Sequence, residues 1–386
     1  MTARMYKAFA ISLLALMFVC QCAVAVPALA AEEEVEMAFA KVTQILSEED
    51  LSDDDSGFGY PLVLQIIEME ILTGDFRGTL IESEHIVDFN YAYNITINPG
   101  SEFLVIIERD AEGGLLDAFI VERARQRHLI WLLLSYILVM GLVGGRKGLQ
   151  AILALALTGL AIVKILLPMI LDGRNPILVS LLVCIGVIVI TLLIIGGLSK
   201  KTLAAIFGTA GGLLVAGGLA FAAGRAAQLS GLGNQEAQLL MFIPQEVSLD
   251  FQGILFAAII LGALGAVMDV GMSVASAMWE VTEAKPDIGQ RDLFRAGMNV
   301  GRDLMGTMSN TLILAYTGGA LHLLLLFLAY QVPFVEIINQ DMIASEVVRA
   351  LAGSIGLVLT VPITALFAAT VGRKRHPRES SKEHSL

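Results

Sequence analysis

Long apolar stretches fill the chain from about residue 129 onward, and short polar segments separate them. Seven of these stretches are long enough to cross the roughly 30 Å hydrocarbon core of a bilayer. They lie near 129–145, 149–171, 176–198, 202–224, 252–277, 304–330 and 347–371. The pattern therefore predicts an α-helical polytopic membrane bundle of about seven transmembrane helices at 123–372, followed by a basic tail at 373–386.

Residues 57–122 have a different pattern, with short runs rich in β-branched and aromatic residues between glycine-containing turns. Such runs are typical of β-strands. We expect strands at 62–72, 79–87, 91–97, 102–108 and 115–121. Five short strands in this length predict a small all-β domain, a barrel or curled sheet of the OB-like or SH3-like type. We expect the acidic segment before it, 31–56, to be a flexible lead-in or a short helix.

The first 30 residues resemble a secretory signal peptide. Arg4 and Lys7 precede an apolar run, and the segment ends in Ala28-Leu29-Ala30. A basic start, a short apolar stretch and a small-x-small site are the parts of such a signal. An uncleaved anchor helix is the alternative. Both interpretations predict that the β-domain is exported.

Basic residues in the short loops predict the orientation of the bundle, because they are enriched on the cytoplasmic side. With the β-domain outside, the cytoplasmic segments hold Arg146 and Lys147; Lys200 and Lys201; Lys285, Arg291, Arg295 and Arg302; and Arg373, Lys374, Arg375 and Arg378. Arg123, Arg125 and Arg127 lie on the opposite side of the first span. A signal-exported domain crosses the membrane regardless of such charges. We therefore expect a cytoplasmic C-terminus and a plasma-membrane location.

Composition excludes several classes of function. Hydrophobic residues make up 56% of the chain and charged residues only 16%. The formal net charge of −12 belongs mostly to residues 31–120, and such an acidic domain repels phosphate backbones, so we expect no nucleic-acid partner. Three cysteines provide no disulfide framework, and the chain contains no cofactor motif, so we expect no cofactor.

Polar residues inside the predicted fifth and sixth spans provide the candidate site. Gly262, Gly265, Asp269, Ser273, Ser276 and Glu280 recur at intervals of three or four, which places them on one helical face. Asn299, Asp303, Gly306, Asn310 and Thr317 form a matching row on the next span, where Arg302 and Thr307 add further donors. A carboxylate at mid-bilayer costs about 2.5–3.5 kcal/mol on insertion scales, so we do not expect Asp269 to face lipid.

We expect the two polar faces to pack together, around a hydrogen-bonded core or a hydrated cavity. The predicted ion or polar site comprises Asp269, Ser273, Ser276, Asn299, Arg302, Asp303, Thr307 and Asn310. Two interpretations stay open, a structural pairing of Asp269 with Arg302 and a functional acidic site. In the other spans, the glycines of 202–224 favour close helix packing, and Arg349 is interpreted as an anchor at the start of the last helix.

Two strings in this region, Gly262-Ala263-Leu264-Gly265-Ala266-Val267-Met268-Asp269-Val270 and Asn299-Val300-Gly301-Arg302-Asp303-Leu304-Met305-Gly306-Thr307, resemble the YibE/F family of bacterial membrane proteins. The similarity runs from near Leu62 to about Gly372. The resemblance implies a multi-pass plasma-membrane protein with an exported β-domain. It implies no mechanism and no catalytic residues.

Two functions fit these observations. The first is a transporter or permease, with an ion or small molecule bound at Asp269 between the fifth and sixth helices. The second is a non-transporting scaffold or sensor, in which the β-domain meets an envelope protein or a second copy of the chain. An enzyme is not expected. Asp269 and Asp303 could form an aspartyl pair, but Val300-Gly301-Arg302-Asp303 departs from GxGD, and no HExxH or P-loop occurs.

Overall fold

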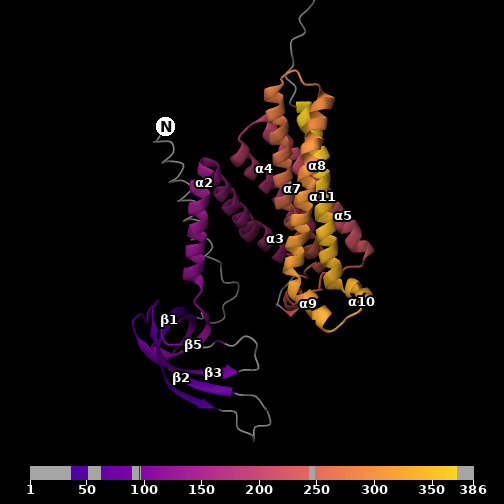
Figure 1. Cartoon of the computed structure of the whole chain (residues 1–386). Coiled ribbons are helices and arrows are strands. Elements are labelled where there is room, and N and C mark those ends of the chain that lie inside the picture. The colour runs from indigo at the N-terminus through magenta and orange to yellow at the C-terminus, as the bar shows by residue number, and fades with distance from the viewer. Residues whose placement is uncertain (1–35, 51–61, 89–94, 96, 243–247, 372–386) are drawn as a thin grey trace, which may run out of the picture. The chain divides into compact units, whose positions relative to one another are not determined.

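The computed structural model describes residues 36–50, 62–88, 95, 97–242 and 248–371 (Figure 1). The predicted signal peptide at 1–30 and basic tail at 373–386 lie outside the described residues. Among these residues, those up to Met140 form one compact unit and those from Gly141 onward form another.

The first unit contains a five-stranded antiparallel sheet with the order β3-β2-β1-β4-β5. The strands are β1 (Glu36–Asp50), β2 (Leu62–Ile71), β3 (Leu80–Asp88), β4 (Glu102–Arg109) and β5 (Leu115–Arg123). β1 pairs with β2 and, through its first part, with β4. Its register shifts twice opposite β2, between Val42 and Gln44 and between Ile45 and Ser47. Such irregularities bend a strand and increase its twist. The sheet is therefore curled, and β3 and β5 also contact each other.

The prediction for residues 31–56 was wrong over 36–50, because this segment is the central strand of the sheet. Ala38, Ala40 and Val42 alternate into the core and are at most 1% exposed. The dense acidic residues around them led to the prediction of a solvated segment. The strand predicted at 91–97 lies mostly outside the described residues, and Ile95 and Ile97 are not in a strand. The other four predicted strands are confirmed.

One arginine joins three segments of this domain. The Arg109 guanidinium donates through Nε to Glu36 (2.8 Å) and through Nη2 to Asp75 (2.8 Å). It also lies 4.8 Å from the centre of the Phe76 ring. The two carboxylates raise the pKa of Arg109, which therefore stays charged. The contact ties the start of β1 and the β2–β3 turn to the end of β4.

We predict that the β-domain loses stability in mild acid through His85. This imidazole is half-buried, and its Nε2 donates to the Ile95 carbonyl (3.1 Å). Burial lowers the pKa of His85 below its usual 6.5. As pH falls through about 6.5, the unfolded chain therefore takes up the proton first and stability decreases. The decrease stops below the folded-state pKa.

Hydrogen exchange of β2 and β3, corrected for intrinsic rates, measures this effect between pH 7 and pH 5. His85→Gln keeps an N–H donor but does not titrate, so protection in this variant should change less with pH. An equal pH dependence in both proteins would refute the role of His85.

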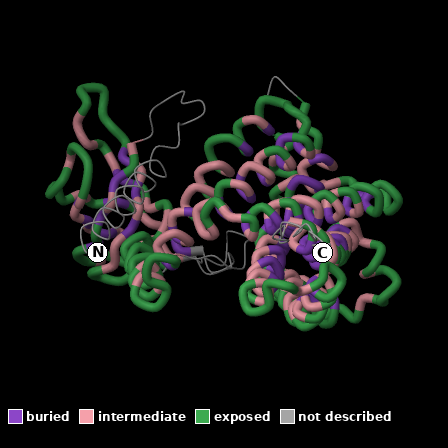
Figure 2. Tube along the Cα trace, turned by 90° about the horizontal axis from the view of Figure 1, so that it is seen from above, coloured by how far each residue is buried: buried purple, intermediate pink, exposed green. Residues whose placement is uncertain are grey.

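The second unit is helical (Figure 1). The first helix of the chain begins in the other unit and continues into this one. The helical segments are α2 (Gln126–Ala161), the π-helical turn η1 (Ile162–Leu166), α3 (Leu167–Leu171), α4 (Pro176–Gly196), α5 (Lys200–Ala226), α6 (Gln235–Leu239), the 3-10 turn η2 (Leu240–Phe242), α7 (Phe251–Ala284), α8 (Gln290–Gly319), α9 (Leu321–Ala329), α10 (Phe334–Asn339) and α11 (Asp341–Val371). Figure 2 shows that buried positions gather where helices of this unit meet.

Within the described part of the chain, five helices are long and apolar enough to cross a membrane, or six if α8 and α9, bent by 60°, form one crossing. The predicted count of seven is therefore not confirmed. The predicted spans 129–145 and 149–171 belong to one helical segment, Gln126–Leu171, with a kink at Gly145 (φ 52°, ψ −130°). The predicted span 304–330 corresponds to the last part of α8 followed by α9.

The centre of the helical unit is a close junction of α5, α7 and α11. Glycines on one helix face threonines on another: Gly208 meets Thr364, Gly212 meets Thr360 and Gly271 meets Thr209. All three threonines are fully buried. Small residues let helix backbones approach closely in membranes. Gly208 and Gly212 of α5 therefore serve the packing role that the sequence favoured.

We predict that Gly212→Ala destabilises the helical unit. An added Cβ would collide with the Thr360 hydroxyl and lie 2.9 Å from the Gly356 carbonyl oxygen. Overpacking of this kind typically costs about 1–3 kcal/mol. Gly218→Ala is the matched control on the same helix, since nothing lies within 4 Å of its Cβ position. Thermal unfolding in detergent should show a lower midpoint for Gly212→Ala only. Equal midpoints for the two variants would contradict the close junction.

Candidate functional site

The polar faces of α7 and α8 lie on neighbouring helices, which run side by side (Figure 1). Gly262, on the same face of α7 as Asp269, points toward α8: a Cβ there would lie 2.7 Å from the Tyr316 hydroxyl. The opposite face of α7 is buried against α4, α5 and α11. The packing of α7 therefore leaves its polar face at the edge of the contact with α8.

The two acidic groups of the predicted site have no partners among the described residues. Asp269 and Asp303 are both exposed. Neither carboxylate has a hydrogen bond or an ion pair within that part of the chain. Arg302 instead donates to the Asn299 side-chain oxygen on its own helix (3.2 Å). The structural pairing of Asp269 with Arg302 is thus not formed.

The other predicted site residues flank the contact between α7 and α8. Ser273, Asn299, Thr307 and Asn310 are exposed, and Ser276 is half-buried. The Thr307 hydroxyl donates within its own helix, to the Leu304 carbonyl (3.1 Å).

Apolar side chains and glycines form the helix contact itself. Gly297 of α8 lies against Met278 of α7, and Gly301 lies against Val361 of α11. Met305 and Met308 pack on the same core. The predicted hydrogen-bonded core between the two polar faces is therefore absent from the described residues, and the polar rows run along the outside of the contact.

A second polar group, which the sequence analysis did not identify as a site, lies near one end of this contact. Arg349 of α11 pairs with Glu346 (2.9 Å) and lies 5.9 Å from the centre of the Tyr316 ring on α8. The hydroxyls of Ser309 and Ser354 are buried and have no hydrogen-bond partner within the described part of the chain. Arg349 was interpreted as an anchor. The sequence signal for this ion pair was the spacing of three residues between Glu346 and Arg349, because residues spaced in this way are neighbours on a helix.

The exposed polar rows constrain what surrounds α7 and α8. Asp269, Arg302 and Asp303 would each be costly against hydrocarbon. Water or another protein segment must therefore cover this face. Carboxylate, hydroxyl and amide oxygens can bind a cation or a proton, or accept hydrogen bonds from a polar solute. Within the described part of the chain, no three His, Cys, Asp or Glu side chains are grouped to hold a metal ion.

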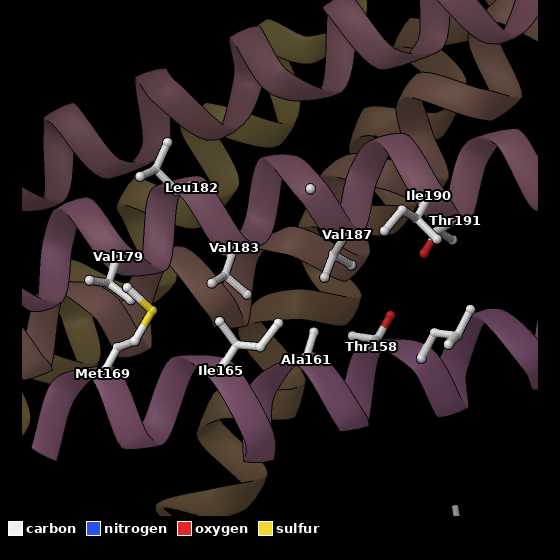
Figure 3. A pocket seen from close by; sticks show the side chains of 12 residues that line it. Thr158, Ala161, Ile165, Met169, Val179, Leu182, Val183, Val187, Ile190 and Thr191 are labelled. Atoms are coloured by element: carbon white, nitrogen blue, oxygen red, sulfur yellow. The ribbon is translucent and has the colours of Figure 1, made fainter. Parts of the chain in front are cut away.

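The helical unit also contains an apolar groove of about 320 Å³ between α2–α3 and α4 (Figure 3). Ile165 and Met169 line one side, and Val183 and Val187 line the other. Thr158 adds a hydroxyl, but this donates to the Ala154 carbonyl of its own helix (2.9 Å). The groove thus presents mainly hydrocarbon and does not extend the polar site.

The long apolar helices define a membrane protein that carries a separate curled β-sheet. The chain belongs to the YibE/F-like protein family, whose model matches residues 132–374, more than half of its length. The match begins after β5, so the strands of the β-domain lie outside it. Neither the curated proteins nor the solved structures gave a match to this chain.

We predict that Glu346 and Arg349 stabilise the helical unit as a pair. Removing one partner leaves a half-buried charge without its counter-ion, whereas replacing both does not. Residues in one salt bridge typically show coupling energies of about 0.5–3 kcal/mol. Thermal unfolding of Glu346→Gln, Arg349→Gln and the double variant measures the coupling. Additive shifts in the midpoint would show that the two side chains act independently.

Proposed function

We propose that this protein is a membrane transporter or permease rather than an enzyme. In this proposal the polar faces of α7 and α8 line the route of an ion or a small polar molecule. The supporting observation is that Asp269 and Asp303 lie exposed on two long neighbouring helices, and that their carboxylates have no partner among the described residues. Membrane proteins keep intramembrane acids mainly where they face water, a partner or a substrate.

Six side chains of the site have proposed roles. The Asp269 carboxylate binds the cation or proton, and the hydroxyls of Ser273 and Ser276 supply further oxygens one and two turns along the same face. Across the contact, Asp303 and Asn310 provide a second set of oxygens. Arg302 interacts with anionic groups near the end of the route. Because the sequence carries no P-loop, we propose that an ion gradient or a separate partner supplies the energy.

We further propose seven membrane crossings. The helical segment Gln126–Leu171 has 46 residues, about 69 Å at 1.5 Å per residue, which is more than twice the hydrocarbon thickness. The break at Gly145 is followed directly by Arg146 and Lys147, as expected where a chain leaves the membrane. Two crossings there, together with α8 and α9 as one, give seven. The β-domain is then outside the plasma membrane and the C-terminus is cytoplasmic.

For the β-domain we propose the OB type. Each of β3 and β5 pairs with one neighbour, and the two also contact each other, so the sheet approaches closure. A five-stranded, partly open barrel is the form of OB domains.

Asp269→Asn tests the transport proposal, because it removes the charge and keeps the size of the side chain. We expect a cation or a polar solute to raise the unfolding midpoint of the wild type in detergent, but not that of the variant. A ligand at 100 times its Kd stabilises by about 2.7 kcal/mol. Glu280→Gln is the matched control, since Glu280 is an exposed acid on the same helical face. It should keep the ligand response.

Two results would contradict the proposal. The first is a response to the ligand that is equal in Asp269→Asn and the wild type. The second is an early-melting Asp269→Asn variant together with a wild type that responds to no cation, amino acid, nucleotide or pH change. The polar face would then serve packing alone.

A scaffold or sensor function is the second candidate, favoured by the apolar surface of the β-domain. Large apolar side chains on β3 and β5 are exposed: Leu80, Ile86, Leu116, Phe119 and Val121. Exposed strands of this kind accept partner strands. In this function an envelope protein or a second copy of the chain binds the β-domain. Replacing Phe119 and Val121 with serine would abolish function while ligand binding at Asp269 stays intact.

A further inference from the structure

A basic pocket lies between the β-sheet and the start of α2. It has a volume of about 450 Å³, and four side chains that carry or can accept positive charge line it: Arg123, Arg125, Arg127 and His128. The pocket belongs to one compact unit. Its composition is unusual for this unit, since the only basic residues between 31 and 120 are Lys41, Arg77 and Arg109.

Backbone contacts fix the shape of this pocket. β5 ends at Arg123, and the Ala124 N–H donates to the Glu102 carbonyl at the start of β4 (3.0 Å). Two acids accompany the cations: Glu102 lines the pocket, and Glu122 accepts from Arg125 (2.9 Å). Among the side chains that line the pocket, three are arginines and one is an acid.

The adjoining helix places the pocket at a membrane surface. α2 begins at Gln126, within the pocket-lining segment, and its apolar side chains start at Leu129. Leu129, Ile130 and Trp131 are each more than half exposed, as expected for side chains that meet lipid. Tryptophan is enriched at the boundary between lipid and water. The arginines therefore lie at the level of the lipid headgroups, on the side of the membrane that carries the β-domain.

We propose that this basic pocket binds the phosphate of an anionic phospholipid headgroup. A guanidinium matches the geometry of phosphate oxygens and can donate two parallel hydrogen bonds to them. Basic residues next to a span also gain from the negative potential of anionic lipids. The pocket offsets the repulsion between an acidic domain and an anionic surface, and it holds the β-domain at a defined height. The proposal is independent of the transport function.

Native mass spectrometry of the full-length protein, extracted from nanodiscs of mixed phosphatidylglycerol and phosphatidylcholine, tests this proposal. The wild type should retain phosphatidylglycerol in preference to phosphatidylcholine. The variant Arg123→Gln/Arg127→Gln should lose that preference by about tenfold or more, since each basic residue near the surface contributes to binding. Arg125 stays unchanged because it pairs with Glu122.

Three controls make the result decisive. Arg77→Gln removes an exposed arginine elsewhere in the β-domain and should retain the lipid preference. Arg127→Lys keeps the charge and should retain most of it. If the double variant fails to fold, single Arg127→Gln is measured in the same way and should show a partial loss.

An unchanged preference in the folded arginine-to-glutamine variants would overturn the proposal, and so would an equal loss in Arg77→Gln. Inorganic phosphate serves as a separate probe. Thermal stabilisation of the protein by phosphate, without any preference between the two lipids, would identify a site for free phosphate instead and would also overturn it.

Discussion

The close junction of α5, α7 and α11 determines how the other features of the helical unit are arranged. Glycines on one helix leave room for the buried threonine side chains of another, so these helices approach closely. This contact buries one full face of α7, on which Ile260, Val267 and Val274 lie. A helix whose apolar face is fixed in this way must direct its remaining face outward. The position of Asp269 thus follows from the packing of the opposite face of α7.

The same reasoning applies to α8. Two of its glycines, Gly297 and Gly301, pack on methionine and valine side chains, so its polar residues lie beside the contact and not in it. Two polar rows then lie next to each other on the outside of an apolar bundle. Contact between that surface and the lipid hydrocarbon would cost free energy, so water or protein must cover it. Transport uses such a water-covered face, and this is why we favour it over a purely structural role.

Sequence patterns predicted much of this fold. Several long apolar helices and four of the strands were predicted from periodicity and composition, whereas the predicted count of seven spans is not confirmed. β1 was missed because Glu48, Glu49 and Asp50 end a strand whose first half alternates alanine and valine into the core. High charge density and strand alternation occur in the same segment, and the charge was given more weight.

The contacts between elements could not be read in the same way. A helical wheel shows that Asp269 and Ser273 share a face, but the rotation of α8 against α7 depends on how Gly297 and Gly301 fit on two other helices. The pairing of Asp269 with Arg302, one of the two interpretations that the sequence left open, is not formed, and Arg302 donates to Asn299 instead. The sequence could indicate the Glu346–Arg349 pair through its helical spacing. It could not indicate the contact of Arg349 with Tyr316, because that contact joins two different helices.

The most direct test of a hydrated polar face is the reactivity of single cysteines in intact membranes. Cysteines at Ser273 and Asn310, in a background without the native cysteines, report on the two polar rows. Leu214→Cys on α5 is the control, because Leu214 is an exposed apolar position. A charged, water-soluble thiol reagent should label positions 273 and 310 and leave 214 unlabelled. If the first two positions were as unreactive as position 214, no water would reach this face, and the proposed route would not exist.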